Sequence, residues 1–231
     1  MSPTGRALAS LKPPLAVLCD FDDTTAVENV AEIIMTRFGD ERWRSMRMEF
    51  RTGRYTLREY QEKAFSLLEV SRDDMVAAVQ ERATLRPGFK ELHGYCCEHD
   101  VALAIVSNGL DFYVQALLER EGLGDLPIHT VQARFNSNGI EFAYPYADPA
   151  CSDFGNCKCR VLEEYSKQGR SIVYVGDGRT DFCAAAAADL VFAHKDLARF
   201  CRTYGIPHVA FADFGDVLQL VRKVTEEASC D

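Results

Sequence analysis

The stretch Leu15-Ala-Val-Leu-Cys-Asp-Phe-Asp-Asp-Thr24 decides the fold of this 231-residue chain. Its first five residues are apolar and indicate a short buried strand. Two acidic residues, Asp20 and Asp22, follow where that strand ends. Carboxylates in such a place are costly unless a cation compensates them. At the end of a strand, in a chain that alternates strands and helices, a carboxylate pair indicates an active site.

Three further motifs follow along the chain, two of them at the ends of other strand-like runs. Ser107-Asn-Gly109 closes the apolar run 101–106 and offers a hydroxyl and backbone N–H groups to an anion. The alternative for this tripeptide is a helix cap or a tight turn. Gly176-Asp-Gly-Arg-Thr-Asp181 closes the run 171–175, and its two aspartates, four residues apart, can point toward one centre. Lys158 precedes a helical pattern and, on its own, would be interpreted as a solvated surface charge.

The apolar patterns between these motifs predict an α/β fold. Strands are expected at 15–20, 101–106, 128–133, 171–175 and 189–193, with a weaker one at 208–211. Helices are expected at 88–99, 110–121, 157–167, 179–188, 196–204 and 214–226. This alternation predicts a Rossmann-like, doubly wound parallel sheet with helices on both faces. All four motifs then lie at the carboxyl ends of strands, where ligands bind in such sheets.

Two insertions interrupt the alternation. Residues 26–85 show helical spacing without a convincing strand, which predicts a small helical cap over the site, inserted after the first strand. Residues 134–155 are interpreted as a β-hairpin insertion, because strand-like runs flank the turn sequence Asn136-Ser-Asn-Gly139. The rest of the chain is expected to divide into a loosely held tail over 1–14 and the core over 15–25 and 86–231.

The composition excludes several classes of function. The apolar content of 47% supports a real core, and the net charge of −9 argues against nucleic acid or an anionic membrane as a partner. An acidic protein with an anionic substrate needs local cations, so a metal is plausible. Because no apolar run approaches about 18 residues and no signal peptide is recognised, we expect a cytoplasmic protein without a transmembrane helix.

The chain has nine cysteines, an odd number. In a cytoplasmic protein we expect them to be reduced thiols. The spacing of Cys151, Cys157 and Cys159 matches no common zinc module. A bound metal there is the minor alternative. We expect these three to be reduced thiols that stabilise the hairpin region and set the direction of Lys158, without a catalytic role.

Taken in order, the four motifs resemble those of the haloacid-dehalogenase-like (HAD) superfamily of phosphohydrolases, whose pattern is DxDxT, Ser or Thr after a strand, Lys, and GDxxxD. The resemblance covers residues 15 to about 221 and is strongest to the phosphoserine-phosphatase-like branch. Within that branch it points to the methionine-salvage phosphatases that act on 2-hydroxy-3-keto-5-methylthiopentenyl-1-phosphate. The narrower resemblance rests on Leu85-Arg-Pro-Gly88, Ser107-Asn-Gly-Leu-Asp-Phe112, the cysteine-rich stretch 151–159 and Asp189-Leu-Val-Phe-Ala193. Asp23 departs from the pattern, which usually has a small residue there.

The resemblance implies how the motif residues act. Asp20 would attack phosphorus and form an aspartyl-phosphate. Asp22 would protonate the leaving alkoxide and then deprotonate the water of the second step. The groups implied to hold the phosphoryl oxygens are Ser107, Asn108, Gly109 and Lys158. The carboxylates that converge on the site imply one Mg²⁺, and its implied ligands are the Asp20 side chain, the Asp22 backbone carbonyl and Asp177, with Asp181 holding a bound water.

Substrate choice is expected to lie in the cap. In the phosphoserine branch, acidic residues after the first motif hold the substrate ammonium. The matching positions here are Glu28 and Asn29, so one acid is missing, which favours a neutral polyol or keto phosphate. Lys63 and Arg47 are cap cations within possible reach of a substrate oxygen; their alternative is the solvated face of a helix.

The resemblance therefore predicts a Mg²⁺-dependent phosphatase of a small phosphorylated metabolite, monomeric or homodimeric, with no nucleic acid or membrane partner. The alternatives are a phosphatase of phosphoserine or another metabolite, a phosphomutase with the same carboxylate pair, and a non-catalytic binding protein on the same fold. A dehalogenase is disfavoured, because displacement of a halogen from carbon does not use Asp22.

Overall fold

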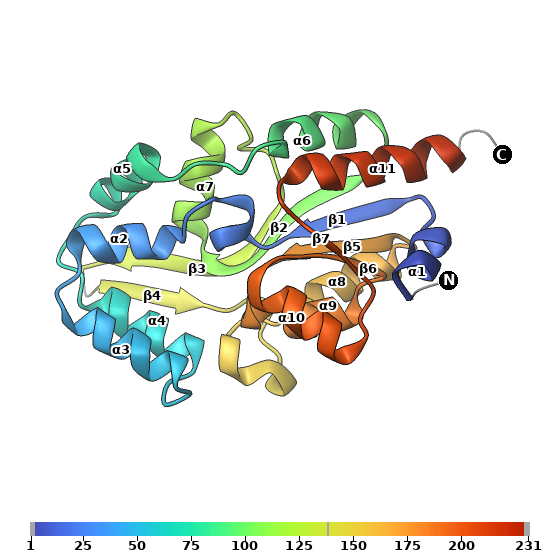
Figure 1. Ribbon diagram of the computed structural model, residues 1–231. Helices are drawn as coiled ribbons and strands as arrows, with labels where there is room; N and C mark the ends of the chain where they lie inside the picture. The colour runs from blue at the N-terminus through green and yellow to red at the C-terminus, as the bar shows by residue number, and fades with distance from the viewer. Residues whose placement is uncertain (1–2, 138, 229–231) are drawn as a thin grey trace.

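The computed structural model describes residues 3–137 and 139–228, which form one seven-stranded sheet flanked by helices (Figure 1). The strand order is β4-β3-β2-β1-β5-β6-β7, and every neighbouring pair is parallel except β3 with β4. The strands are β1 (Leu15–Cys19), β2 (Ala102–Leu110), β3 (Ile128–Asn136), β4 (Gly139–Ala143), β5 (Ser171–Gly176), β6 (Leu190–Ala193) and β7 (His208–Ala210). The predicted α/β fold is confirmed.

Helices connect these strands. They are α1 (Pro3–Ser10), α2 (Val30–Phe38), α3 (Arg42–Arg51), α4 (Leu57–Ser66), α5 (Arg72–Arg82), α6 (Phe89–Glu98), α7 (Asp111–Arg120), α8 (Lys158–Lys167), α9 (Phe182–Ala187), α10 (Lys195–Tyr204) and α11 (Phe214–Ala228). Three short turns, η1 (Phe21–Thr25), η2 (Pro149–Phe154) and η3 (Arg179–Asp181), lie between them. In the described ranges, no helix is long and apolar enough to cross a bilayer.

The sheet separates two apolar cores. Along β1, Leu15, Val17 and Cys19 face one core, and Ala16 and Leu18 face the other. This two-sided burial explains why the strand is apolar throughout and does not alternate with polar residues. The first core is covered by α6, α7 and α11, and the second by α8, α9 and α10, which lie on opposite sides of the sheet in Figure 1.

The strand order places the site. From β1, the chain builds β2 and β3 on one side and later β5, β6 and β7 on the other, so β1 is flanked by β2 and β5. In such sheets, ligands bind beyond the carboxyl ends of the strands at the point where the order reverses. The ends of β1, β2 and β5 carry three of the four motifs, and the first turn of α8 carries the fourth.

Residues 26–85 contain α2, α3, α4 and α5, with no strand. The two links that join this segment to the sheet lie side by side: the Val27 N–H donates to the Thr84 carbonyl at 2.9 Å, and the Arg86 N–H donates to the Thr25 carbonyl at 2.8 Å. Because both links are paired, the helical segment leaves and returns to the core at one place.

Gly88 follows the second link in a conformation that requires glycine. Its φ is +83°, and a Cβ there would lie 2.5 Å from the backbone nitrogen of Gly215. A side chain would therefore meet both backbone strain and a backbone clash. The contact fixes the start of α6 against the start of α11.

One expectation needs correction. Residues 3–10 are not a loose tail but form α1, because Ala7 and Leu11 lie four residues apart and are buried in the first core; residues 1 and 2 lie outside the described part. The expected hairpin is present: β3 continues from the core, and β4 adds an antiparallel edge strand. Asn138, within the predicted turn, lies outside the described residues.

Candidate active site

A buried lysine joins two of the predicted aspartates. Lys158, at the start of α8, places its Nζ 2.6 Å from an oxygen of Asp20, which follows β1, and 2.6 Å from an oxygen of Asp181. The exposed fractions are 2% for Lys158, 6% for Asp20 and zero for Asp181. Burial alone would lower the pKa of Lys158, but Asp181 and Asp20 together raise it above its ordinary value. The lysine is therefore a fixed cation and not a solvated surface charge.

Asp181 is the most firmly held carboxylate of this group. Its Oδ1 accepts a hydrogen bond from the Tyr174 hydroxyl at 2.7 Å in addition to that from Lys158. Its Oδ2 accepts from the backbone N–H groups of Asp177 at 3.0 Å and Gly178 at 2.9 Å. The second aspartate of the GDxxxD motif thus shapes the loop that carries the first.

The first motif separates its two carboxylates. The Asp20 N–H donates to the Val175 carbonyl, which continues the pairing of β1 with β5. Asp22 turns away toward α2, where one oxygen accepts from the Val30 N–H at 2.6 Å and the other accepts from the Tyr113 hydroxyl at 3.0 Å. Burial is the largest effect on Asp22 and raises its pKa to about 6, although these hydrogen bonds oppose the rise.

Asp23, the departure from the superfamily pattern, has a φ of 61°. Such a left-handed conformation explains the usual small residue at this position, and Asp tolerates it better than most side chains. Its added charge is compensated by Lys195, whose Nζ lies 2.5 Å from Asp23 and 3.2 Å from Asp177. Lys195 could not be predicted to meet these carboxylates, because it begins α10, far along the chain.

The carboxylates of Asp20, Asp177 and Asp181 have oxygens that all lie within 4.8 Å of one another. Burial has the largest effect on the pKa of Asp20, followed by repulsion from Asp181. Together they raise this pKa well above its usual range, although Lys158 opposes the rise. The same two causes raise the pKa of Asp177 to about 6. These three carboxylates face two lysines, Lys158 and Lys195, so the group carries more negative charge than its lysines balance. An all-oxygen donor set with excess negative charge fits Mg²⁺.

The second motif differs from its expected form. β2 continues through it to Leu110, with a shift of register between Val106 and Leu110. Ser107 is buried, and its Oγ accepts a hydrogen bond from the Gly109 N–H at 2.9 Å, so that N–H is already engaged. The side-chain amide of Asn108 donates to the carbonyls of Phe154 and Asn156. The Asn108 side chain thus packs against η2, while Ser107, Asn108 and Gly109 all line the same cavity as Asp20 and Asp22.

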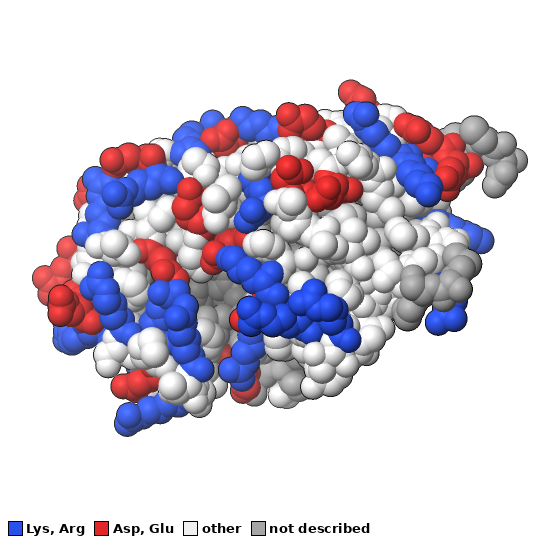
Figure 2. Space-filling model, in the orientation of Figure 1, with Lys and Arg blue, Asp and Glu red and all other residues white. Residues whose placement is uncertain are grey.

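Three of the four motifs open into a cavity of about 310 Å³ between the sheet and the helical segment; the buried Lys158 and Asp181 do not line it. Asp20, Asp22, Ser107 and Asp177 line its floor from the sheet side. Figure 2 shows a hollow on this face with Lys and Arg side chains on both sides of it, and Arg47, Arg51 and Arg179 are the lining arginines. The local charge thus suits an anionic substrate despite the net charge of −9.

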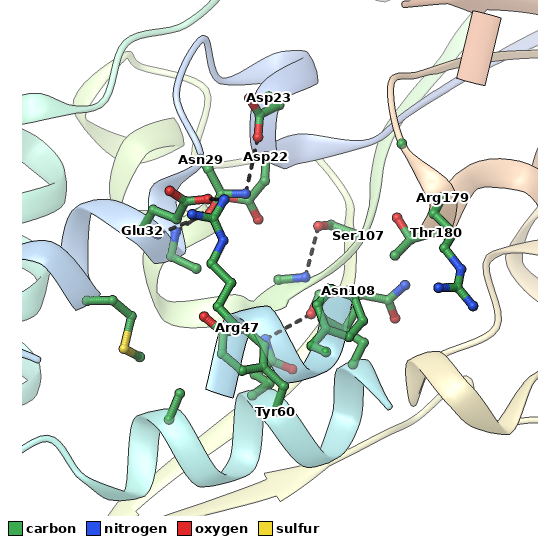
Figure 3. Close-up of a pocket in the computed structure, with 18 of the residues that line it drawn as sticks. Asp22, Asp23, Asn29, Glu32, Arg47, Tyr60, Ser107, Asn108, Arg179 and Thr180 are labelled. Carbon is green, nitrogen blue, oxygen red and sulfur yellow. Dashed lines mark hydrogen bonds and ion pairs between the residues drawn. The ribbon is translucent and has the colours of Figure 1, made fainter. Parts of the chain in front are cut away.

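The cap residues predicted to meet substrate divide into two groups. Asn29 and Arg47 line the cavity, and Figure 3 shows Arg47 reaching from α3 to its ion-pair partner Glu32 beside Asn29. Glu28 and Lys63 do not line it. The Glu28 carboxylate accepts from the Thr84 N–H at 2.8 Å, and the exposed Lys63 lies over the Tyr55 ring.

Asn29 also has a structural part. Its side-chain oxygen caps α2 by accepting from the Glu32 N–H, and its amide donates to Asp23. Sequence reasoning missed Glu32, Tyr60 and Tyr113, which also line the cavity. These residues lie on α2, α4 and α7. The helical spacing of the sequence predicts those helices, but it does not show which side of each helix faces the cavity.

Comparison with known proteins gives the family. Residues 15–209 match the model of the family described as Putative Phosphatase. A 2-hydroxy-3-keto-5-methylthiopentenyl-1-phosphate phosphatase of Brevibacillus brevis is 32% identical over 216 residues, which cover 92% of this chain and 97% of that protein. The bifunctional enzyme MtnB/MtnX of Bacillus licheniformis is 34% identical over 94% of this chain and 51% of its own length.

Solved structures show the same fold. A HAD family hydrolase of Salmonella enterica serovar Typhi superimposes with a TM-score of 0.75 at 18% identity, over 92% of this chain and 72% of that one. A phosphoserine phosphatase, solved as a phospho-aspartyl intermediate analogue, gives 0.69 at 21% identity, over 91% and 99%. The chain belongs to the Putative Phosphatase family of the HAD-like superfamily and is a phosphatase, as its motifs predict.

Proposed function

We propose that this phosphatase uses Mg²⁺ to hydrolyse a small phosphate monoester through an aspartyl-phosphate on Asp20. The observation that carries the proposal is the division of the aspartates at one cavity. Asp20, Asp177 and Asp181 form a charged group with Lys158, whereas Asp22 is held apart by α2 and Tyr113. A nucleophile and an acid–base group that act in the same reaction need such different surroundings.

In the first step, an oxygen of Asp20 attacks phosphorus while the bond from phosphorus to the ester oxygen breaks. Asp22 gives its proton to the departing alkoxide. In the second step, Asp22 takes a proton from water, and the water oxygen attacks phosphorus and releases Asp20 with inorganic phosphate. A pKa of about 6 for Asp22 suits both roles, because both protonation forms are populated near neutral pH.

The residues that would hold Mg²⁺ are Asp20 and Asp177 through their side chains and Asp22 through its backbone carbonyl. Asp181 already accepts from four donors, which favours an indirect part through a bound water. When bound, Mg²⁺ supplies the positive charge that keeps these carboxylates ionised and offsets charge on the phosphoryl oxygens. Lys158 and the Ser107 hydroxyl then hold the remaining phosphoryl oxygens.

For the leaving group, the cap side of the cavity supports the substrate named for the relatives, 2-hydroxy-3-keto-5-methylthiopentenyl-1-phosphate. Met35, Phe50, Leu57 and Phe65 form an apolar wall from α2, α3 and α4, which suits a methylthio group. Arg47 at the same wall suits a carbonyl or hydroxyl oxygen. Phosphoserine is a poorer fit, because its ammonium needs a carboxylate, and Glu28 and Glu32 are engaged by Thr84 and Arg47.

Phosphate release from matched esters tests the proposal. Replacement of the methylthio group by a hydroxyl should lower kcat/KM by about tenfold, since burial of two apolar atoms stabilises by roughly 1.5 kcal/mol. O-phosphoserine should be turned over more slowly still, and Asp20→Asn is the inactive control. Equal kcat/KM for the three esters would overturn the substrate assignment. Phosphate release by Asp20→Asn at the wild-type rate would overturn the mechanism.

A further inference from the structure

Four cysteines lie near Lys158, and none of them lines the cavity. The sulfurs of Cys151 in η2, Cys157 before α8 and Cys159 in α8 all lie within 4.8 Å of one another. Cys183 on α9 is the fourth cysteine of this region: it neighbours Cys159 and Cys151, although its sulfur does not lie within 4.8 Å of all three. All four are free of disulfides. We propose that these four thiolates bind one structural Zn²⁺.

The geometry is close to what zinc requires. With Zn–S distances of about 2.3 Å, the sulfurs of a tetrahedral site lie about 3.8 Å apart, so the three nearest sulfurs need only small movements. The ligands come from three separate elements, a turn and two helices, which explains why the spacing resembles no common zinc module. The sequence expectation of reduced thiols that stabilise the hairpin region did not include Cys183, which only the fold brings near the other three.

The surroundings also suit thiolates. Cys157 is the N-cap residue of α8 and Cys159 lies in its first turn, where the helix dipole favours negative charge. Thiolates select zinc over the oxygen-preferring Mg²⁺, so this site is chemically distinct from the carboxylate group. Four protein ligands leave no open position, which is the mark of a structural site.

The position indicates what the metal would hold together. Cys157 and Cys159 flank Lys158, and Cys183 lies two residues after Asp181. Zinc would therefore join the chain segments that carry the two partners of a 2.6 Å ion pair. It would fix the start of α8 against α9. This inference does not depend on which substrate the enzyme hydrolyses.

Elemental analysis of the full-length protein, purified without chelators, tests the inference. We expect about one zinc per chain in the wild type and in Cys97→Ser, a matched control at an exposed cysteine outside the group. Cys183→Ser and Cys157→Ser should lose it. Because these variants could misfold, Co²⁺ exchanged into the wild type gives a second readout. It should show the intense visible bands of a tetrahedral site and a sulfur-to-cobalt charge-transfer band.

Three outcomes would overturn the inference. The first is wild-type protein without zinc whose four thiols all react with a thiol reagent. The second is a disulfide between Cys159 and Cys183 in the protein as isolated, found by mass spectrometry. The third is zinc that survives in folded Cys183→Ser but is lost from Asp177→Asn, which would place the metal at the carboxylates. None of these measurements depends on phosphatase activity.

Discussion

Replacement of Lys158 by Met should destabilise the protein strongly, because it removes the cation between two buried carboxylates. Asp20 and Asp181 each lie 2.6 Å from its Nζ and are almost completely buried. Removal of one partner from a buried ion pair costs about 3–5 kcal/mol. For a chain of this size, 1 kcal/mol corresponds to about 2–4 °C in Tm, so Tm should fall by about 6–20 °C.

Lys195→Met is the matched control. Lys195 also contacts two carboxylates, those of Asp23 and Asp177, but its side chain is 45% exposed. Ion pairs at such exposure contribute about 0–1 kcal/mol, so the control should lose little stability. Urea unfolding of both variants, without added metal, measures the difference. Equal losses in the two variants would refute the argument that burial decides the effect.

The pH dependence separates charge from packing. In Lys158→Met, Asp20 loses the cation that lowers its pKa, so its already raised pKa should rise further. A carboxyl with a raised folded-state pKa binds its proton more tightly in the folded state, so it destabilises the fold as pH rises above the unfolded value. The stability deficit of the variant relative to wild type should therefore grow as pH rises above the raised pKa that Asp20 has in the wild type. A deficit that is constant with pH would indicate lost packing alone.

Three further results are expected. Asp20→Asn should leave less than about a hundredth of wild-type turnover with an unchanged fold by circular dichroism, since the nucleophile is lost; a faster variant would contradict covalent catalysis there. Because burial raises the pKa of Asp22 to about 6, log kcat/KM for an alkyl phosphate should fall above that pH as the acid loses its proton, and Asp22→Ala should remove this dependence. EDTA should abolish turnover, and Mg²⁺ but not the larger Ca²⁺ should restore it; full activity in EDTA would exclude the metal.

Much of the core of this site could be predicted because its signals are local. Each motif follows or begins an element whose apolar pattern is visible in the sequence, and parallel strands bring their carboxyl ends to one edge. Asp20, Asp177 and Asp181 therefore meet as expected. The distinct surroundings of Asp22 could not be predicted, since they depend on Tyr113, which reaches it from α7.

The cap was predicted less well for a physical reason. Helical spacing shows which side chains of a helix are buried, but not which element buries them. Glu28 was expected to face substrate, yet the pairing of the two links places it on Thr84. The amino-terminal helix was not predicted because its apolar side chains are few. Only contact with the sheet makes them part of the core.

Asp23 shows how the fold absorbs a departure from a family pattern. A small residue is usual there because the backbone is left-handed, with φ of 61°, and Asp adds a charge beside a group already rich in carboxylates. Lys195 compensates that charge from 172 residues away and also reaches Asp177. The unusual acid and its cation are therefore one electrostatic unit. Lys195 also opposes the rise in the pKa of Asp177, so the unit helps to keep a proposed metal ligand ionised.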